Sequence, residues 1–179
     1  MPWRPSAAPN EPPAGDAARF DAVVLVHLQS GYALARWLVR DPTLAQDVVQ
    51  DAVLRALGYL GSFRGGDARA WFLRIVRNVA YDGLARQRTA GAQELGEAAE
   101  SVADAADDPE AALLRRERGA TLERCLEALA PELRECLVLK ELEGLSYRQI
   151  SEVTGVPIGT VMSRLWRARQ ALTAKAEHS

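Results

Sequence analysis

The segment LSYRQISEVTGVPIGTVMSRLWRARQAL, residues 145–172, most strongly constrains the fold of this 179-residue chain. Ser146 and Gln149 have the spacing of a capping box, which starts a helix. Gly155 follows where a tight turn between helices needs an unhindered backbone, and Pro157 suits the start of a second helix. That second helix has apolar residues at spacings of three and four, namely Val161, Leu165, Ala168 and Leu172. The segment therefore predicts a helix-turn-helix.

The remaining positions of the second predicted helix are small or basic, and they point away from the apolar stripe. They include Gly159, Thr160, Ser163, Arg164 and Arg167. A helix of this kind inserts its N-terminal part into the major groove of DNA, where Arg can read guanine. The alternative is an ordinary helical hairpin with solvated arginines, but the capping box, the turn glycine and the basic outer face all favour DNA binding.

The rest of the chain also has helical character. Aromatic residues make up only 6% of the sequence, and Ala, Leu, Arg and Glu dominate. Apolar periodicity predicts helices at about 20–39, 42–57 and 68–88, which would form one compact domain over residues 18–88. Asp41 and Pro42 are a suitable N-cap and first residue for the second of these helices. Residues 1–17 contain five prolines and are predicted to be a disordered tail.

Charge is distributed unevenly, although the net charge is only −2. The stretch from Arg64 to Arg88 has six Arg and two Asp, whereas Glu94 to Glu110 has seven acidic residues and no basic one. Residues 89–108 are therefore predicted to be an acidic flexible linker. A second helical domain is expected over residues 109–176, with a helix to about Leu129 and another from Pro131 that Gly144 ends. The expected fold is all-α, with two small helical domains joined by this linker.

Several classes of protein are disfavoured by what the sequence lacks. The two histidines, His27 and His178, have no nucleophile pairing, and no glycine-rich phosphate loop follows a strand, so we do not expect an enzyme. Cys125 and Cys136 lack metal-ligand spacing and are expected to be small core residues, with no metal site and no cofactor. No signal peptide is recognisable and no stretch approaches 18 apolar residues, which predicts a cytoplasmic protein without direct membrane insertion.

Three stretches together resemble the extracytoplasmic-function sigma factors, the minimal class of the sigma-70 superfamily. The first two are DPTLAQDVVQDAVLRAL and FRGGDARAWFLRIVRNVAYDGLARQR, and the third is LEGLSYRQISEVTGVPIGTVMSRLWRAR. The resemblance covers residues 20–174. It implies that residues 18–88 are sigma region 2 and residues 109–176 are sigma region 4. It also implies a sigma factor that binds core RNA polymerase and directs transcription initiation at selected promoters.

The resemblance implies roles for several residues of the first domain. Asp47, Gln50 and Asp51 would dock on the clamp coiled coil of the largest polymerase subunit. The segment 63–88 would melt the −10 element, with Asn78 near a captured base. Residues expected to hold the DNA backbone there are Arg64, Arg69, Arg74 and Arg77. Trp71 could stack on a base, but its spacing with Ile75 and Val79 favours a core position, and Phe72 and Tyr81 are expected to be structural.

In the second domain the resemblance implies contacts with the −35 element. The residues expected to make them are Arg148, Thr160, Ser163, Arg164 and Arg167. Met162 departs from the family pattern, because many members have Arg there, so a different −35 preference is expected. Trp166 could lean against DNA or cover the helix pair. The acidic linker could imitate a nucleic-acid backbone in the polymerase or serve as a simple tether.

The expected partners are core RNA polymerase, through its clamp coiled coil and flap region, promoter DNA, and an anti-sigma factor. The main alternative is a helix-turn-helix regulator that binds an operator as a dimer and senses a ligand through its first domain. No ligand pocket or dimer seam is evident in the sequence to support that alternative.

Overall fold

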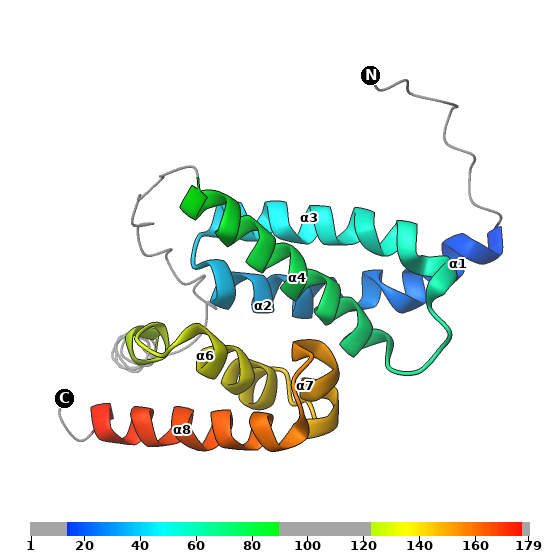
Figure 1. The fold of residues 1–179 in the computed structure, drawn as a ribbon. Coiled ribbons are helices and arrows are strands. Elements are labelled where there is room, and N and C mark those ends of the chain that lie inside the picture. The colour runs from blue at the N-terminus through cyan, green and yellow to red at the C-terminus, as the bar shows by residue number, and fades with distance from the viewer. Residues whose placement is uncertain (1–13, 90–122, 177–179) are drawn as a thin grey trace, which may run out of the picture.

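Every regular element in the part of the chain that the computed structural model describes, residues 14–89 and 123–176, is helical (Figure 1). The N-terminal module, residues 14–89, contains α1 (Ala14–Val23), η1 (Leu25–His27), α2 (Leu28–Val39), α3 (Pro42–Tyr59), η2 (Leu60–Ser62) and α4 (Ala68–Thr89). The C-terminal module, residues 123–176, contains helical residues 123–127, α6 (Pro131–Leu137), the π-helical turn η3 (Val138–Leu142), α7 (Tyr147–Thr154) and α8 (Ile158–Ala176). The predicted all-α fold is confirmed. The predicted tail up to residue 13, the linker from residue 90 to 108, and the helix before residue 123 lie outside the described residues.

Close packing of α2, α3 and α4 forms the N-terminal module (Figure 1). Helix α4 contributes the fully buried Phe72, and α3 buries a row of small side chains, which are Ala45, Val48, Ala52 and Ala56. Gly31 of α2 lies directly against α4, because a Cβ atom there would come within 2.8 Å of Phe72 Cε1. The small residues thus let the three helices approach closely.

A side-chain cap begins each of α3 and α4, and the cap of α3 is the one that the sequence predicts. Asp41 accepts a hydrogen bond from the Leu44 amide at 2.9 Å, and Pro42 occupies the start of the helix. Asp67 accepts a hydrogen bond from the Ala70 amide at 2.8 Å. These bonds satisfy amides that have no partner within the first helical turn.

The first predicted helix differs from the structure in two respects. Helix α1 begins at Ala14, within the segment expected to be a disordered tail, because alanines after the last proline favour a helix. The predicted helix over 20–39 is also interrupted by η1. Its run of β-branched and apolar residues bends there and places Val24 in the core with no exposure.

The helix-turn-helix in the C-terminal module is confirmed. Both bonds of the Ser146–Gln149 capping box are present, and Gly155 adopts a left-handed conformation with φ of 73°. Val161, Leu165 and Ala168 are buried on the inner side of α8. The helix predicted from Pro131 begins as α6 and continues as the wider turn η3, and Gly144 beyond it adopts a left-handed conformation with φ of 64°.

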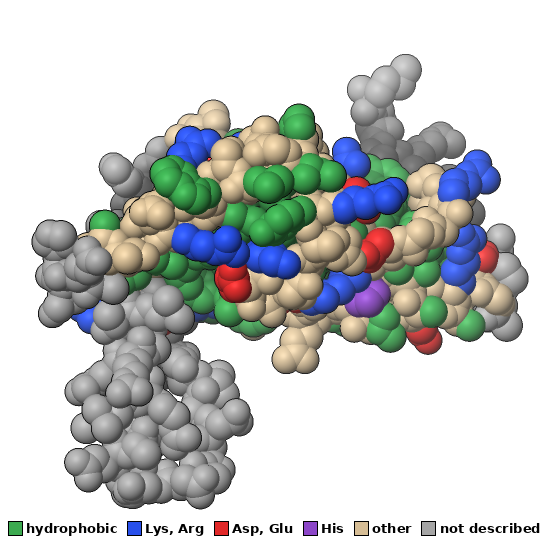
Figure 2. Space-filling model, turned by 90° about the horizontal axis from the view of Figure 1, so that it is seen from below, with side chains coloured by type: hydrophobic (Ala, Val, Ile, Leu, Met, Phe, Trp, Pro, Cys, Tyr) green, Lys and Arg blue, Asp and Glu red, His purple; other side chains and the backbone are tan. Residues whose placement is uncertain are grey.

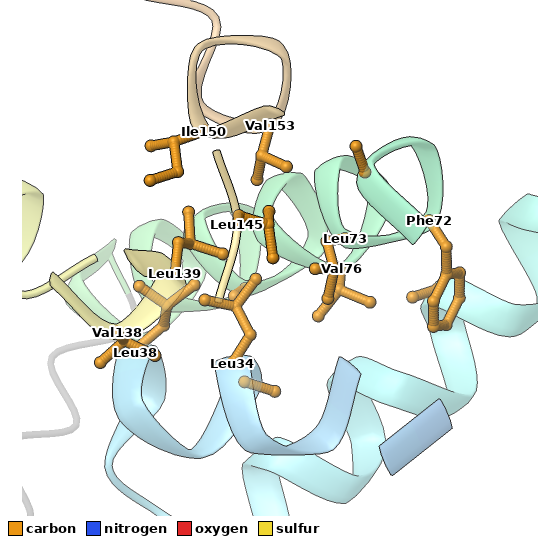
Figure 3. Close-up of a cluster of buried hydrophobic side chains, with 14 of the residues drawn as sticks. Leu34, Leu38, Phe72, Leu73, Val76, Val138, Leu139, Leu145, Ile150 and Val153 are labelled. Atoms are coloured by element: carbon orange, nitrogen blue, oxygen red, sulfur yellow. The ribbon is translucent and has the colours of Figure 1, made fainter. Parts of the chain in front are cut away.

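The two modules share one hydrophobic cluster, which separate domains would not have (Figure 3). Helix α7 packs against α4, and α6 packs against α2. We call the buried residues shown in Figure 3 the intermodule core. The N-terminal module contributes Leu34, Leu38, Phe72, Leu73 and Val76, and the C-terminal module contributes Val138, Leu139, Leu145, Ile150 and Val153. The sequence did not predict this contact.

The segment Gly15–Val39 has the length and mean hydropathy, 1.3, of a helix that could cross a membrane, although polar and charged residues interrupt it and it contains no run of 18 apolar residues. Its α2 part contributes Leu34 and Leu38 to the intermodule core, and η1 interrupts it. Core helices of soluble proteins meet the same criterion, so the segment is weak evidence for a membrane span.

Candidate nucleic-acid interface

The predicted −10 residues, of which Arg64 precedes α4 and the others lie on it, divide into two groups by their exposure. Arg64, Arg74 and Asn78 are exposed, and Arg74 and Asn78 are four residues apart, on one side of the helix. Arg69 and Arg77 are half-buried and turn toward the C-terminal module. The structure thus brings part of the predicted set to an open surface and places the rest in a contact between modules.

Arg77 and Arg69 each bind a carboxylate of the C-terminal module. Arg77 Nε donates to Glu135 Oε1 at 2.5 Å, and the Glu135 side chain is completely buried. Arg69 donates to Glu143. Burial raises the pKa of the Glu135 carboxyl, and the neighbouring Arg77 opposes that shift. Tyr81, whose hydroxyl donates to Glu135 Oε2 at 3.4 Å, has its pKa raised to about 12, mainly by burial.

The helix-turn-helix presents a basic outer surface, as predicted. Arg148, Ser163 and Arg167 are exposed, and Thr160 is half-buried at the start of α8. Arg167 Nε donates to the Ser163 carbonyl at 3.4 Å, which holds its side chain along α8. Seen from below, the molecule has Lys and Arg side chains spread among hydrophobic ones, with few acidic side chains (Figure 2). This surface has the charge and small side chains that contact with a DNA groove requires.

Arg164 lies differently from the other predicted −35 residues. It is half-buried, and its positive charge lies close enough to Glu135 to oppose the raised pKa of that carboxyl. It also interacts with Cys136, whose thiol pKa is raised chiefly by burial. Arg164 therefore faces α6 in this conformation, and Ser163 and Arg167 face outward.

Helix α8 also exposes an apolar stripe. From the sequence, two of its residues, Met162 and Trp166, were each considered, but they were not predicted to form one surface. Ile158, Met162 and Trp166 recur every four residues, and Trp166 is 64% exposed. Trp166 therefore does not cover the helix pair, which was one of its two expected positions. Met162, the departure from the family pattern, lies in the middle of this exposed stripe.

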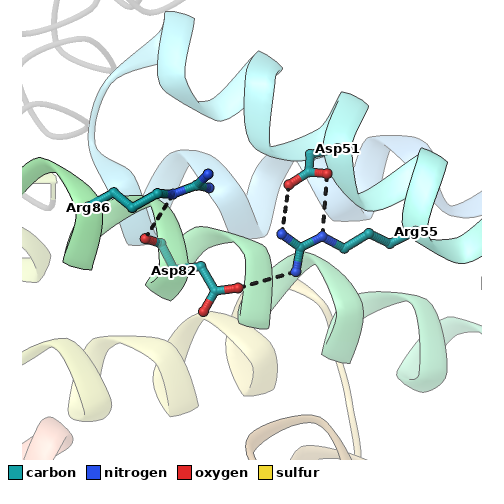
Figure 4. A network of polar contacts seen from close by, with 4 residues as sticks. All are labelled: Asp51, Arg55, Asp82 and Arg86. Atoms are coloured by element: carbon teal, nitrogen blue, oxygen red, sulfur yellow. Dashed lines mark hydrogen bonds and ion pairs between the residues drawn. The ribbon is translucent and has the colours of Figure 1, made fainter. Parts of the chain in front are cut away.

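The outward face of α3 contains the predicted polymerase-binding residues, of which Figure 4 shows Asp51 together with Arg55. Asp47 and Gln50 are exposed, and Asp51 binds Arg55 through two hydrogen bonds at 3.0 and 3.3 Å. Arg55 also bonds to Asp82 of α4 at 3.2 Å, so Asp51 belongs to a network that joins two helices. Asp47 and Gln50 remain available for a partner.

Two exposed leucines on α3 were not predicted from the sequence to belong to a binding surface. Leu54 is 68% exposed and Leu57 is 49% exposed, and Leu54 follows Asp47 by seven residues, which places both on one face. The signal was available, because Leu54 falls outside the apolar stripe that packs into the core. Exposed apolar side chains beside exposed polar ones are typical of a surface that binds another protein.

Two aromatic residues and both cysteines lie buried or half-buried in the fold. Trp71 is half-buried with its ring centroid 5.1 Å from that of Phe63, which agrees with the expected core position. Phe72 is fully buried, Cys136 is buried and Cys125 is half-buried, and both cysteines are free. Within residues 14–89 and 123–176, no three His, Cys, Asp or Glu side chains form a group that could hold a metal ion.

A helical bundle joined to a helix-turn-helix with a basic outer surface is typical of proteins that act in transcription. Comparison with protein families identifies the class more closely. Residues 24–90 match the family described as Sigma-70 region 2, and residues 120–172 match Sigma-70, region 4. The chain is 40% identical to the RNA polymerase sigma-H factor of Pseudomonas aeruginosa, over 88% of this chain and 86% of that protein. The chain belongs to the sigma-70 family, and it acts in promoter-specific transcription initiation.

Other similarities agree with this assignment. The ECF RNA polymerase sigma-E factor of Escherichia coli K12 is 35% identical over 73% of each chain. The sigma factor RpoE from Bartonella quintana, solved with the anti-sigma factor NepR, covers 88% of this chain and 96% of its own with a TM-score of 0.73 and 26% identity. The structure of CnrH with the cytosolic domain of CnrY shares the fold, with a TM-score of 0.66, 24% identity, and coverage of 92% of this chain and 96% of that one.

Proposed function

We propose that the two modules read two separate promoter elements while α3 holds the polymerase. The observation that carries this proposal is the presence of two exposed basic surfaces, one on α4 and one on α7 and α8, in separate modules of one chain. In this proposal residues 18–88 act at the −10 element and residues 109–176 at the −35 element. Residues 89–108 link the two and fix their spacing.

The −10 element is melted and held by the α4 surface. Bases leaving the duplex need a pocket or a polar partner, and the backbone beside them needs positive charge. Asn78 is exposed and its amide can hydrogen-bond to a base edge, while Arg74 is exposed one turn earlier on α4 and Arg64 is exposed ahead of the helix. Arg69 and Arg77 join this set when they leave their partners in the C-terminal module.

The −35 element is read by α8. Arg167 is the exposed side chain that suits a bidentate contact with guanine, and Ser163 leaves room for close approach. Arg148 lies on α7 with 84% of its side chain exposed and is placed for a phosphate contact. Thr160, at the start of α8, lies where a helix N-terminus approaches the DNA backbone. Arg164 contributes only if its side chain turns outward.

Core polymerase binds the exposed face of α3. Asp47 and Gln50 supply polar contacts to the clamp coiled coil, and Asp51 supports them through Arg55. Leu54 and Leu57 add apolar area, which ordinarily provides most of the binding free energy at an interface. The C-terminal module would contact the flap region. Both DNA surfaces then act together, because one docked complex raises the effective concentration of each.

The remaining expectations follow from this role. The chain works by positioning polymerase on DNA and performs no catalysis of its own. It acts in the cytoplasm, where polymerase and promoters are found, and an anti-sigma factor binds it. The similar sigma factor RpoE was solved in complex with the anti-sigma factor NepR.

Run-off transcription with purified core polymerase on a library of randomised promoters tests this proposal. The enriched templates should contain two sequence elements at a fixed separation upstream of the start site. No specific transcript with core polymerase, together with binding to a palindromic operator as a dimer, would instead support the regulator.

A further inference from the structure

Helix α8 exposes three apolar side chains to which the proposed function gives no role. Ile158, Met162 and Trp166 are all exposed, and their spacing of four residues places them along one side of the helix. Single exposed apolar residues are common on protein surfaces, whereas a contiguous row of them marks a binding surface. We call these three residues the α8 stripe. The question is which partner offers apolar groups to this stripe.

The α8 stripe adjoins the polar side chains that the proposed function assigns to the −35 element. Ser163 follows Met162 directly in the sequence, and Arg167 follows Trp166 in the same way. Successive residues of a helix lie about 100° apart around its axis, so each pair covers neighbouring parts of the surface. All four of these residues are exposed. The α8 stripe and the polar residues are therefore two adjacent rows of one outward surface.

The charge of this surface favours duplex DNA as its partner. Residues 158–169 contain three arginines and no Asp or Glu, which is complementary to the phosphates that border a DNA groove. Helix α8 lies along the lower side of the molecule in Figure 1, and the view from below shows hydrophobic side chains beside Lys and Arg on that face (Figure 2). Gly159 has no side chain, and nothing lies within 4 Å of a Cβ atom placed there. The start of α8 is therefore open to the close approach of base edges.

The major groove offers one distinct apolar group to such a stripe, which is the C5 methyl of thymine. The other bases are distinguished there by their hydrogen-bond donors and acceptors. Met162 has a long, unbranched and polarizable side chain that can pack around a methyl group. It has no N–H donor and only a weak acceptor, so it cannot read guanine as Arg does. Met162 therefore suits thymine better than any other base.

We propose that Met162 reads a thymine of the −35 element through the C5 methyl group of that base, with Ile158 and Trp166 on either side of the contact. This inference rests on the proposed function, which assigns α8 to the −35 element. Reading of the element is then divided between the two rows of α8. Arg167 recognises guanine through hydrogen bonds, and the α8 stripe recognises thymine through apolar contact.

Replacement of thymine by deoxyuridine tests this contact, because it removes the C5 methyl group and leaves base pairing unchanged. The template is a promoter that the full chain selects with core polymerase from the randomised library. Each thymine of its −35 element, on either strand, is replaced in turn, and initiation is measured. One or two replacements should lower initiation by the wild-type chain about fourfold, the effect of burying one methyl-sized group. A −35 element that tolerates every replacement, or that contains no thymine, would overturn the proposal.

Variants of Met162 show whether this side chain makes the contact. Met162→Ala should initiate equally from thymine and deoxyuridine templates, and Met162→Leu should keep most of the difference. Leu142→Ala is the matched control, because Leu142 has the same exposure as Met162, 53%, and lies in η3 of the same module. This control should keep the fourfold difference, and circular dichroism should show wild-type helix content in every variant. A methyl effect as large in Met162→Ala as in wild type would refute the assignment to Met162.

Met162→Arg tests the preference in the opposite direction. Because Arg donates two hydrogen bonds to guanine, this variant should enrich guanine in the randomised library where the wild-type chain enriches thymine. Selection of the same element by both chains would contradict the proposal.

Light scattering of the free chain tests a second copy of the chain as the other possible partner of the α8 stripe. A monomer supports the DNA contact, and a dimer that Met162→Ala dissociates would overturn it. Failure of the proposed function is seen separately, as the absence of any specific transcript from unmodified templates, and it would overturn both proposals.

Discussion

At the scale of single residues, Gly31 shows how one side chain sets the spacing of two helices. It lies near the start of α2, and its weak helix propensity gives no reason for its presence there. The reason is the neighbouring α4, because a Cβ atom would lie 2.8 Å from Phe72 Cε1 and 3.3 Å from Val76 Cγ2. The periodicity of the sequence identified the apolar face of α2 but gave no measure of this distance.

Gly31→Ala should therefore lower the free energy of unfolding of the chain by about 1–3 kcal/mol, the usual cost of overpacking a core. Gly58→Ala is the matched control, since it lies in α3 with nothing within 4 Å of the added Cβ. That control should be neutral or should stabilise the chain by up to about 1 kcal/mol through helix propensity. Urea denaturation measures both, and equal effects of the two substitutions would show that α2 and α4 do not touch at Gly31.

Arg167 is the residue of α8 that we expect to read a base. Arg167→Ala should weaken −35-dependent initiation by about 1–3 kcal/mol, the value of a good bidentate contact. Arg169→Ala is the control, because it removes the same charge from the same helix at a residue that pairs with Glu141. Initiation on promoters with and without the −35 element provides the readout. An unchanged −35 preference in Arg167→Ala would remove this residue from the reading surface.

At the scale of elements, the sequence predicted what local chemistry determines. The Asp41 cap, the Ser146–Gln149 capping box and the left-handed Gly155 all lie where their residue types require them. The π-helical turn η3 and the inward direction of Arg164 were not predictable, because they depend on neighbours outside their own helix. On α3, periodicity located the outward face, but the prediction from family resemblance included only its polar residues.

Leu54→Ser tests the apolar part of that outward face of α3. The side chain is 68% exposed, so the free energy of unfolding should change by no more than about 0.5 kcal/mol. Affinity for core polymerase should fall several-fold, as measured by competition against a labelled wild-type chain. Leu25→Ser, at an exposed leucine of η1, should bind like wild type. If both substitutions leave the affinity intact, α3 does not bind polymerase through Leu54.

Asn78→Ala tests the role of α4 in opening the promoter. Asn78 is exposed beside Arg74, so its loss should remove a base contact while the backbone contacts remain. Formation of the open complex, measured by permanganate reactivity of unpaired thymines, should fall more than binding to the closed duplex. Gln87→Ala, also exposed on α4, should change neither. A parallel loss of closed and open complexes would contradict the melting role.

At the scale of the whole molecule, the order of the helices and the existence of two modules followed from the sequence, but their contact did not. Glu135 and Arg77 are 58 residues apart, and each is an ordinary charged residue on its own helix. Only the position of Glu135 within the apolar run ahead of Leu139 hinted that its carboxylate is buried. Pairing over such distances depends on how the modules dock, and helical periodicity contains no information on docking.

The proposed function requires that two modules of one chain read two elements of one promoter through core polymerase. The most direct test measures initiation by purified core polymerase with this chain on promoters of altered spacer length. The spacer is changed by about half a helical turn, about 5 base pairs. Initiation should collapse when the spacer changes, and it should recover when the original spacing is restored. Initiation at the same level whatever the spacer length, or at the same level without this chain, would show that the two modules do not act together on one promoter.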